Sequence, residues 1–330
     1  MNLLEQLSVP RLDEHLVRVE AALHRAVSSQ DTFLAEVAGH LISAGGKRIR
    51  PMLVVAAASA AGARVTDDVV EGAVSVELVH LGSLYHDDVI DGAETRRGVQ
   101  SVNARWGNLV AIVAGDFLLA RASEIAASLG TEVAGLLAAT ISRLCEGEVA
   151  ELQQAFNPGR PESAYLCAIA GKTASLMATS CRIGALTAGA ERAAVEGLTR
   201  FGEAFGMAFQ IWDDICDLIS TDDVLGKPAG HDIVEGTYTL PVIRALTVPS
   251  AGQELRALLG RPLDPPSRDK ARDIIHSTDA IMASLTVARR YADQAADALV
   301  PLEANADGAL PLIDSLAGLG HHLLDTLDTL

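Results

Sequence analysis

The feature that most constrains this chain is a pair of acid-rich motifs set in apolar, helix-periodic sequence. Residues 84–91 read Leu-Tyr-His-Asp-Asp-Val-Ile-Asp, and residues 211–217 read Ile-Trp-Asp-Asp-Ile-Cys-Asp. Residues four apart share one face of a helix, so the first and last aspartates of each motif face the same way. Like charges at this spacing repel each other, which indicates that a cation binds beside them.

A single motif of this kind is more commonly a solvated helix face. Solvated faces have polar neighbours, whereas Leu84, Val89 and Ile90 flank the first motif and Ile211 and Ile215 flank the second. Carboxylate oxygens without nitrogen or sulfur ligands select a hard ion, and room for water and phosphate oxygens is typical of Mg²⁺. Two such motifs in apolar surroundings favour a magnesium site.

Composition limits both the fold class and the partners. Hydrophobic residues make up 49% of the 330 residues and aromatic residues only 4%. Alanine-rich helical runs therefore favour helices packed on helices over a sheet. The net charge of −17 argues against nucleic acid or an anionic membrane surface as partner, because both are polyanionic. It does not exclude a phosphorylated substrate, because local cations and metal ions reverse the field inside a cleft.

The cysteines and the apolar runs indicate the cellular compartment of the protein. Four cysteines without paired spacing favour free thiols in a reducing compartment over disulfides or zinc: Cys145, Cys167, Cys181 and Cys216. The first residues lack a basic segment followed by an apolar core, so we expect no signal peptide. The longest uncharged apolar run, residues 51–63, is too short to span a bilayer. We expect a cytoplasmic protein without a transmembrane segment.

Helical periodicity and breaker residues predict roughly ten helices in one domain spanning residues 1–330. The predicted helices cover residues 9–28, 32–43, a run beginning at Pro51, 66–91, 108–129, 131–156, 163–188 and 191–219. Further helices follow from residue 239, with breaks at Pro249, 260–266 and 305–308. We find no solenoid repeat and no low-complexity linker in the sequence.

Two groups of cations flank the first acidic motif. Residues 45–51 read Gly-Gly-Lys-Arg-Ile-Arg-Pro, and glycines, clustered cations and a helix start together present donors to an anion. A solvated basic turn is the alternative. Arg96 and Arg97 follow the acidic motif, where they could simply balance its charge. Together, the two groups indicate two anion sites beside one metal site.

Two more lysines have sequence contexts that bear on function. Lys172, within Gly-Lys-Thr, interrupts an apolar helix, where it either extends outward or binds phosphate. Lys227 lies in the charged segment 221–236, which we expect to close over a site.

Other polar residues lie on the acidic helix faces. His80 and Ser83 share the face of Asp87, and Gln210 shares the face of Asp213. A histidine on an inward face is either a core residue or a ligand, and both interpretations stay open here.

Opposed acidic motifs, several cations and an apolar floor suit one class of reaction. They can hold a diphosphate through bridging Mg²⁺ and remove it from carbon, which leaves a carbocation in a dry cavity. The metal ions neutralise charge that develops on the leaving diphosphate, and such electrostatic stabilisation usually contributes most to catalysis.

These motifs resemble those of the trans-isoprenyl diphosphate (polyprenyl) synthases over nearly the full chain. The matching segments are residues 45–51, 77–97, 171–173, 209–217, 226–227 and 236–241. Thr237 stands where a lysine is frequent, which removes one phosphate ligand, and Cys216 stands where leucine is usual. The resemblance implies an all-α, isoprenoid-synthase-type helical bundle around a central cavity, and a homodimer.

The resemblance also implies the roles of individual residues. The expected Mg²⁺ ligands are Asp87, Asp91, Asp213 and Asp217. The expected catalytic residues are Asp87, Asp88, Asp91, Lys172, Asp213 and Asp214. Isopentenyl diphosphate would bind Lys47, Arg50, His80 and Arg97. The allylic diphosphate would bind Arg96, Lys172 and Lys227, with Thr173 and Gln210 beside the developing cation.

Product length follows from the residues before the first acidic motif. The growing chain should run from Asp87 toward the start of its helix, past Ser83 and Gly82, where relatives that stop early carry a bulky aromatic. A helical turn of about 5.4 Å is comparable to one isoprene unit. Small residues here predict an all-trans product of about C30 to C50. A geranylgeranyl (C20) or farnesyl product is the alternative, with Phe117 closing the floor.

Other classes of protein fit the sequence less well. A class I terpene cyclase usually replaces the second motif with an Asn/Ser/Glu triad and needs no second diphosphate site. A non-catalytic partner subunit could lose its acidic motifs, and both are intact here. Glu77-x-x-His80 also matches di-iron bundles, but these need two copies of the pattern, and the sequence has one.

Overall fold

The computed structural model describes residues 6–220, 229–303 and 309–329. The described chain is almost entirely helical, which confirms the predicted fold class. The N-terminal helices are α1 (Leu12–Ala26), α2 (Thr32–Ser43), α3 (Ile49–Ala60) and α4 (Asp67–Ile90). A hairpin of β1 (Thr95–Arg96) and β2 (Val99–Gln100) follows, then α5 (Val102–Trp106), α6 (Asn108–Ser128) and α7 (Thr131–Leu152).

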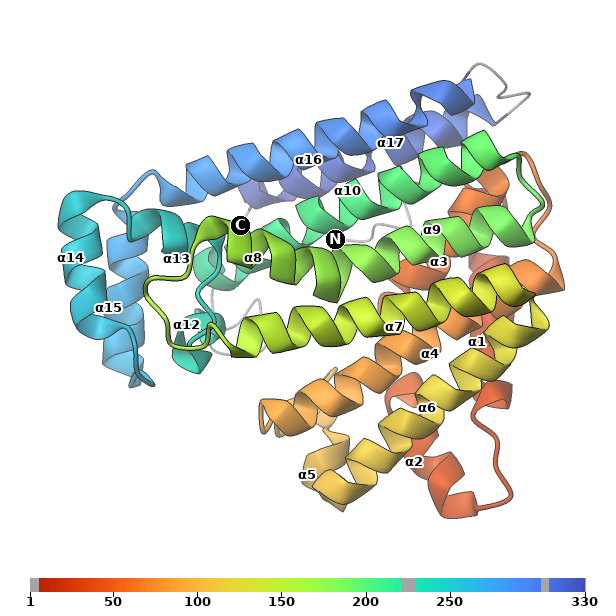
Figure 1. Ribbon diagram of the computed structural model, residues 1–330, viewed down its shortest axis with the longest axis horizontal. Helices are drawn as coiled ribbons and strands as arrows, with labels where there is room; N and C mark the ends of the chain where they lie inside the picture. Colours follow the sequence, from red (N-terminus) through yellow and green to blue (C-terminus); the bar gives the residue numbers. More distant parts are fainter. Residues whose placement is uncertain (1–5, 221–228, 304–308, 330) are drawn as a thin grey trace.

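The second half of the chain packs along the first. Its first elements are α8 (Glu162–Ile169), the π-helical turn η2 (Ala170–Ala174), α9 (Ser175–Thr187) and α10 (Arg192–Ile219). The later elements are α12 (His231–Glu235), α13 (Leu240–Ala245), α14 (Pro249–Leu258), α15 (Pro265–His276), α16 (Ala280–Glu303), α17 (Leu310–Asp325) and the 3₁₀ turn η3 (Thr326–Thr329). The long helices α16, α10, α9 and α7 run side by side (Figure 1).

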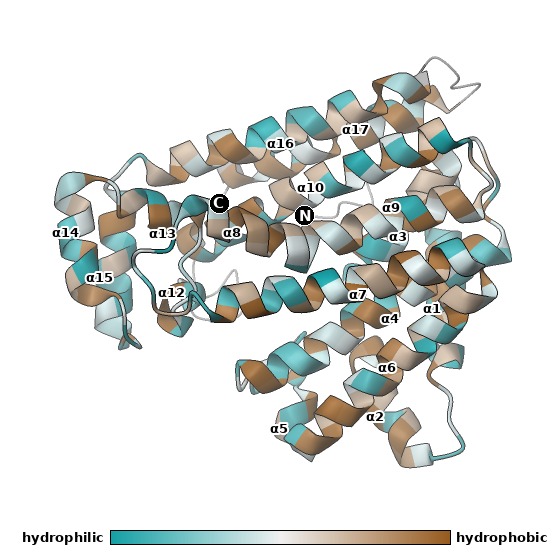
Figure 2. Cartoon of the chain, in the orientation of Figure 1, coloured by the Kyte–Doolittle hydropathy of each residue, from teal (hydrophilic) through white to brown (hydrophobic). Residues whose placement is uncertain are grey.

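Apolar burial determines where each helix lies. Helix α3 is apolar on all sides and packs against α1, α4 and α9, as expected of a fully buried helix. Outer helices have one buried face, and polar and apolar residues alternate along α16 (Figure 2). Among the described residues, no helix combines the length and apolarity needed to cross a membrane. All four cysteines are free thiols, as predicted.

Helix α4 begins where the sequence predicts. The Thr66 hydroxyl accepts the N–H of Val69 at 3.4 Å, and Asp67 and Asp68 lie in the first turn, where acidic side chains favour the helix dipole. The helix ends at Ile90, so Asp87 lies in its last turn. Capping at one end thus fixes the register that presents the first acidic motif.

Helices α3 and α7 have boundaries that differ from the prediction. Helix α3 begins at Ile49 and not at Pro51, because proline is tolerated within a first helical turn. Helix α7 ends at Leu152, four residues early, and its chain turns at Phe156 with φ +56°. The predicted break at 305–308 lies outside the described residues.

The predicted helix 163–188 contains a π-helical turn at residues 170–174. This turn lies at a close crossing with α7. A Cβ on Gly171 would lie 2.8 Å from the carbonyl oxygen of Arg143, and one on Gly147 would lie 2.8 Å from the backbone nitrogen of Lys172. Backbone meets backbone at this point, and π turns of this kind often mark functional sites.

The loop after the first acidic motif forms a hairpin that sequence analysis did not predict. Its two turn residues, Arg97 and Gly98, have φ of +54° and +75°. Positive φ at both positions is the geometry that matches the twist of a two-residue hairpin. The turn directs Arg97 toward the end of α2, where its guanidinium donates to the carbonyl oxygen of Leu41 at 3.0 Å.

Gly184 tests the close packing of α9 on α3. A Cβ at this position would overlap the carbonyl oxygen of Val54. Gly184→Ala should therefore destabilise the protein by about 1–3 kcal/mol. The control is Gly135→Ala in α7, where a Cβ would meet nothing within 4 Å, and which should stabilise by about 0.5–1 kcal/mol. Urea unfolding measures both, and equal effects would contradict the packing account.

Candidate active site

A cavity of about 920 Å³ brings the predicted motifs together. Its lining comes from α4, α7, α8, η2, α9, α10, α12, the 45–50 turn and the hairpin. The predicted residues that line it are Lys47, Arg50, His80, Ser83, Asp87, Asp91, Arg96, Arg97, Lys172, Thr173, Gln210, Asp213 and Asp214. Asp88, Asp217 and Gly82 lie outside the lining, and Lys227 lies outside the described residues.

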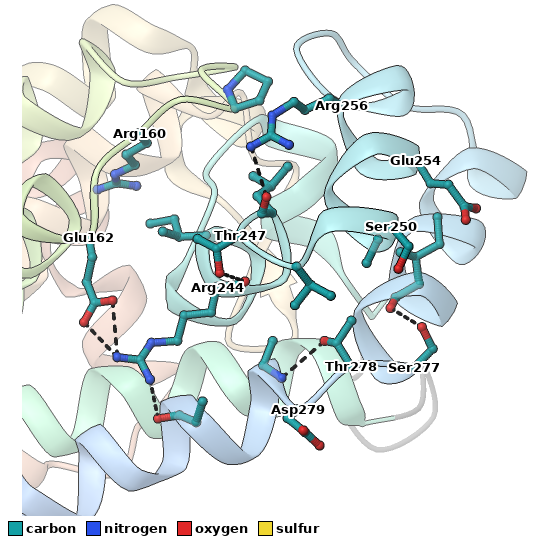
Figure 3. A pocket seen from close by; sticks show the side chains of 18 of the residues that line it. Arg160, Glu162, Arg244, Thr247, Ser250, Glu254, Arg256, Ser277, Thr278 and Asp279 are labelled. Atoms are coloured by element: carbon teal, nitrogen blue, oxygen red, sulfur yellow. Dashed lines mark hydrogen bonds and ion pairs between the residues drawn. The ribbon is translucent and has the colours of Figure 1, made fainter.

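A second hollow, of about 1010 Å³, lies between the start of α8 and helices α13 to α16 (Figure 3). One of its cations is already paired: the Arg244 guanidinium donates to Glu162 at 2.9 Å and to the carbonyl oxygen of Ala283 at 2.7 Å. The hollow contains none of the predicted acidic residues. We therefore place the candidate site in the smaller cavity.

The aspartates of α4 that line the cavity are hard to ionise. The pKa of Asp87 is raised to about 7, chiefly by burial and also by the nearby carboxylates of Glu148 and Asp91, although Lys172 opposes the rise. Burial likewise raises the pKa of Asp91 to about 6, with Glu235 as the strongest neighbouring charge. A bound cation would relieve both effects, since it favours the charged carboxylates.

Two aspartates of the motifs, Asp88 and Asp217, do not line the cavity. Asp88 is fully buried, and its carboxylate accepts the Nε–H of Arg96 at 2.7 Å. Asp217 is also buried, and it accepts the backbone N–H of Asp232 at 3.3 Å. Asp88 therefore positions the guanidinium of Arg96, and Asp217 contacts the first turn of α12. Their direct participation in metal binding stays a prediction.

Asp214 lies at the end of a chain of hydrogen bonds. The Thr173 hydroxyl donates to Gln210 at 2.7 Å, and the Gln210 amide donates to Asp214 at 2.8 Å. The buried Tyr165 hydroxyl also donates to Asp214. Burial raises the pKa of Asp214 to about 7, although both hydrogen bonds oppose the rise. The chain fixes the orientation of Gln210 at the cavity wall.

Lys172 is held by two glutamates that sequence analysis missed. Its ammonium group lies 2.6 Å from both Glu148 and Glu151 of α7. Burial disfavours the charged lysine, but Glu151 and Glu148 outweigh burial and raise its pKa. The sequence does contain a signal for these glutamates. Glu148 and Glu151 come after Gly147 and are three residues apart, so they share one face of their helix.

The second group of cations in the cavity lies around the 45–50 turn. The Lys47 ammonium is 5.9 Å from the ring centroid of Trp212, a cation–π distance. Burial lowers the pKa of Arg50 to about 10, so it stays protonated at neutral pH. Burial, together with Arg50 and Arg97, lowers the pKa of His80 well below its usual value, so the imidazole is neutral.

The cavity fits a hard divalent cation that binds together with its substrate. Asp87 and Asp91 face it from α4 and Asp213 from α10, and all three offer only oxygen donors. Within the described ranges, no three His, Cys, Asp or Glu side chains form a ready-made metal cluster. Three carboxylates from two helices fit a cation whose remaining coordination is supplied by substrate oxygens and water.

Comparison with known proteins identifies the family. The polyprenyl synthetase family model matches residues 31–277. Component 2 of heptaprenyl diphosphate synthase from Geobacillus stearothermophilus is 42% identical over 89% of this chain and 92% of that protein. Nonaprenyl diphosphate synthase from Mycobacterium tuberculosis is 39% identical over 85% of this chain and 84% of that protein.

A solved structure agrees with the fold. Geranylgeranyl pyrophosphate synthase from Corynebacterium glutamicum, complexed with calcium and isoprenyl diphosphate, superimposes with a TM-score of 0.84 at 36% identity, over 97% of this chain and 98% of that chain. The family predicted from the motifs is confirmed. The chain belongs to the polyprenyl synthetase family, whose all-helical members are prenyltransferases of isoprenoid biosynthesis.

Proposed function

We propose that the protein condenses isopentenyl diphosphate with an allylic diphosphate, head to tail, to give an all-trans polyprenyl diphosphate of about C30 to C50. The observation that carries this proposal is one cavity lined by aspartates from both α4 and α10 and by two separate groups of cations. Two anionic substrates need two such groups, whereas a terpene cyclase needs one. Mg²⁺, when bound, would neutralise the charge on the leaving diphosphate.

The residues of the chain have distinct tasks in this reaction. Arg96 and Lys172 would bind the allylic diphosphate, whose C–O bond breaks. Lys47, Arg50 and Arg97 would hold isopentenyl diphosphate so that its alkene carbon forms the new C–C bond, with neutral His80 beside them. The departing diphosphate takes the proton that is lost. Apolar residues that line the cavity would exclude water from the allylic carbocation, among them Leu84, Leu144 and Leu176.

The direct test is turnover by purified protein with Mg²⁺, labelled isopentenyl diphosphate and a geranyl, farnesyl or geranylgeranyl starter. We expect polyprenyl diphosphate only when metal and both substrates are present. Hydrocarbon formed from the allylic diphosphate alone would identify a cyclase instead, and no product with any starter would favour a non-catalytic partner subunit.

The cavity supports a medium or long product, because Ser83 and Leu84, the α4 residues that line it one turn before Asp87, carry no aromatic ring. Gly82 instead packs against α6, where a Cβ would lie 3.1 Å from the carbonyl oxygen of Gly115. Phe117 packs in the apolar core and does not line the cavity. The similar geranylgeranyl synthase keeps a C20 product as the alternative.

We also propose that residues 1–330 form one cytoplasmic domain that pairs with a second copy. Helix α6 supports the pairing, because Leu109 and Val113 are 82% and 61% exposed. Sedimentation should give a dimer that Leu109→Asp dissociates, whereas Val17→Asp, at an exposed site on α1, should not. A monomeric wild-type protein would contradict the homodimer and favour a different partner chain, as the name of the Geobacillus relative suggests.

Product length depends on the size of residue 83. Ser83→Phe would place a ring in the path of the growing chain, so the product should become shorter by one or more isoprene units. Ser83→Ala should leave the product unchanged. Chromatographic sizing decides, and a wild-type product length in Ser83→Phe would refute the path past this turn.

Asp88 and Asp91 point in different directions, so their substitution should give different kinetic effects. Asp88→Asn loses the anchor of Arg96, so the KM for the allylic substrate should rise about tenfold or more, with little change in the Mg²⁺ concentration for half-maximal rate. Asp91→Asn should raise that Mg²⁺ concentration. Steady-state titrations measure both, and the reverse pattern would show that Asp88 is the metal ligand.

A further inference from the structure

A buried ion network lies behind the cations assigned to isopentenyl diphosphate. Its centre is Glu77 of α4, whose exposed fraction is 1%. The Arg48 Nη1 donates to the Glu77 carboxylate at 2.9 Å. Arg48 also donates through Nε and Nη2 to both oxygens of Glu20 in α1, each at 2.9 Å. A bidentate pair of this kind fixes both distance and angle.

Arg48 holds the 45–50 turn through these contacts. Its backbone is left-handed, with φ +48°, a conformation disfavoured for residues with a Cβ. Its guanidinium compensates by donating to the carbonyl oxygens of Ile42 at 3.1 Å and Gly45 at 3.3 Å as well as to the two glutamates. The same turn carries Lys47 and Arg50, so its shape decides where those two cations lie.

The hairpin meets this turn at the same carboxylate. The Arg97 Nη2 lies 3.8 Å from Glu77 Oε1, and Nη1 donates to the carbonyl oxygen of Gly45. Gly46 leaves room for this approach, since a Cβ there would lie 2.8 Å from the guanidinium carbon of Arg97. Glu77 therefore joins two segments that are far apart in the sequence and that both carry substrate-binding cations.

Glu77 is also the buried charge that balances Arg50. Burial lowers the pKa of Arg50, and Glu77 is the strongest charge opposing that effect. The Nε atom of Arg50 is buried without a hydrogen-bond partner among the described residues. Arg48, Arg50 and Arg97 thus surround one covered carboxylate, and without it their mutual repulsion in a poorly solvated site would drive them apart.

We propose that Glu77 and Arg48 are positioning residues for the non-allylic diphosphate. Glu77 sets the spacing of Arg50 and Arg97, and Arg48 fixes Glu77 to α1 and to the 45–50 turn. A carboxylate next to a diphosphate would repel it, so Glu77 acts through the arginines and not on the substrate. The inference rests on the proposed function and adds a layer of residues behind the substrate-binding cations.

The test is Glu77→Gln, which keeps size and removes charge. The KM for isopentenyl diphosphate should rise roughly 10- to 100-fold, because small misplacements of binding groups have effects of this size. The KM for the allylic substrate and kcat should stay within about threefold of wild type. Glu77→Asp should recover part of the loss, and Glu71→Gln, on the same helix but outside the network, should match wild type.

Two results would overturn the proposal. One is an unchanged KM for isopentenyl diphosphate in Glu77→Gln. The other is a similar rise in both KM values together with a lower kcat and a lower unfolding temperature, which would show a purely structural role. If Glu77→Gln does not fold, Glu77→Asp must show a smaller rise in the KM for isopentenyl diphosphate, without a matching change in the other kinetic constants.

Failure of the proposed function would be seen separately. A wild-type protein that forms no polyprenyl product refutes the function, whatever the variants do. Calorimetric binding of isopentenyl diphosphate to wild type and Glu77→Gln would still decide the positioning role, because it needs no turnover. Equal affinities would refute that role.

Discussion

The burial of carboxylates around one cavity is the constraint on which the rest of this structure depends. Apolar packing brings α4 and α10 to one cavity and leaves Asp87 and Asp91 with pKa values of about 7 and 6. Lys172 offsets part of this rise in pKa but is itself bound by Glu148 and Glu151. An acidic cavity of this kind repels a bare diphosphate. A diphosphate that arrives with divalent cations satisfies both the aspartates and the surrounding cations, so metal and substrate binding should be strongly coupled.

Local signals in the sequence predicted the helices and the face that carries the chemistry. The Thr66 cap and the spacing from His80 to Asp87 are short-range features, and the structure follows both. Gln210 likewise faces the cavity with Asp213, one turn apart on α10. These predictions succeeded because helix register is set by neighbours three and four residues away, whatever packs on the helix later.

The features that the sequence did not predict arise from contacts between distant segments. The π turn at Lys172 depends on how closely α7 crosses it, and Gly147 alone did not reveal that crossing. The hairpin depends on left-handed backbone at Arg97, where a residue with a Cβ is uncommon. The direction of Asp88 depends on its contact with Arg96, which the hairpin carries. Spacing identified the residues of the site but not which of them bind one another.

The most direct measurement of the central claim is a crystal structure with Mn²⁺ and a non-hydrolysable allylic thiolodiphosphate, with the ions located by anomalous scattering. The account predicts ions between the α4 aspartates, Asp213 and the diphosphate oxygens, with Lys172 moved from its glutamates toward the substrate. Ions bound elsewhere, or aspartates of α4 and α10 directed apart into solvent with the analogue in place, would contradict it.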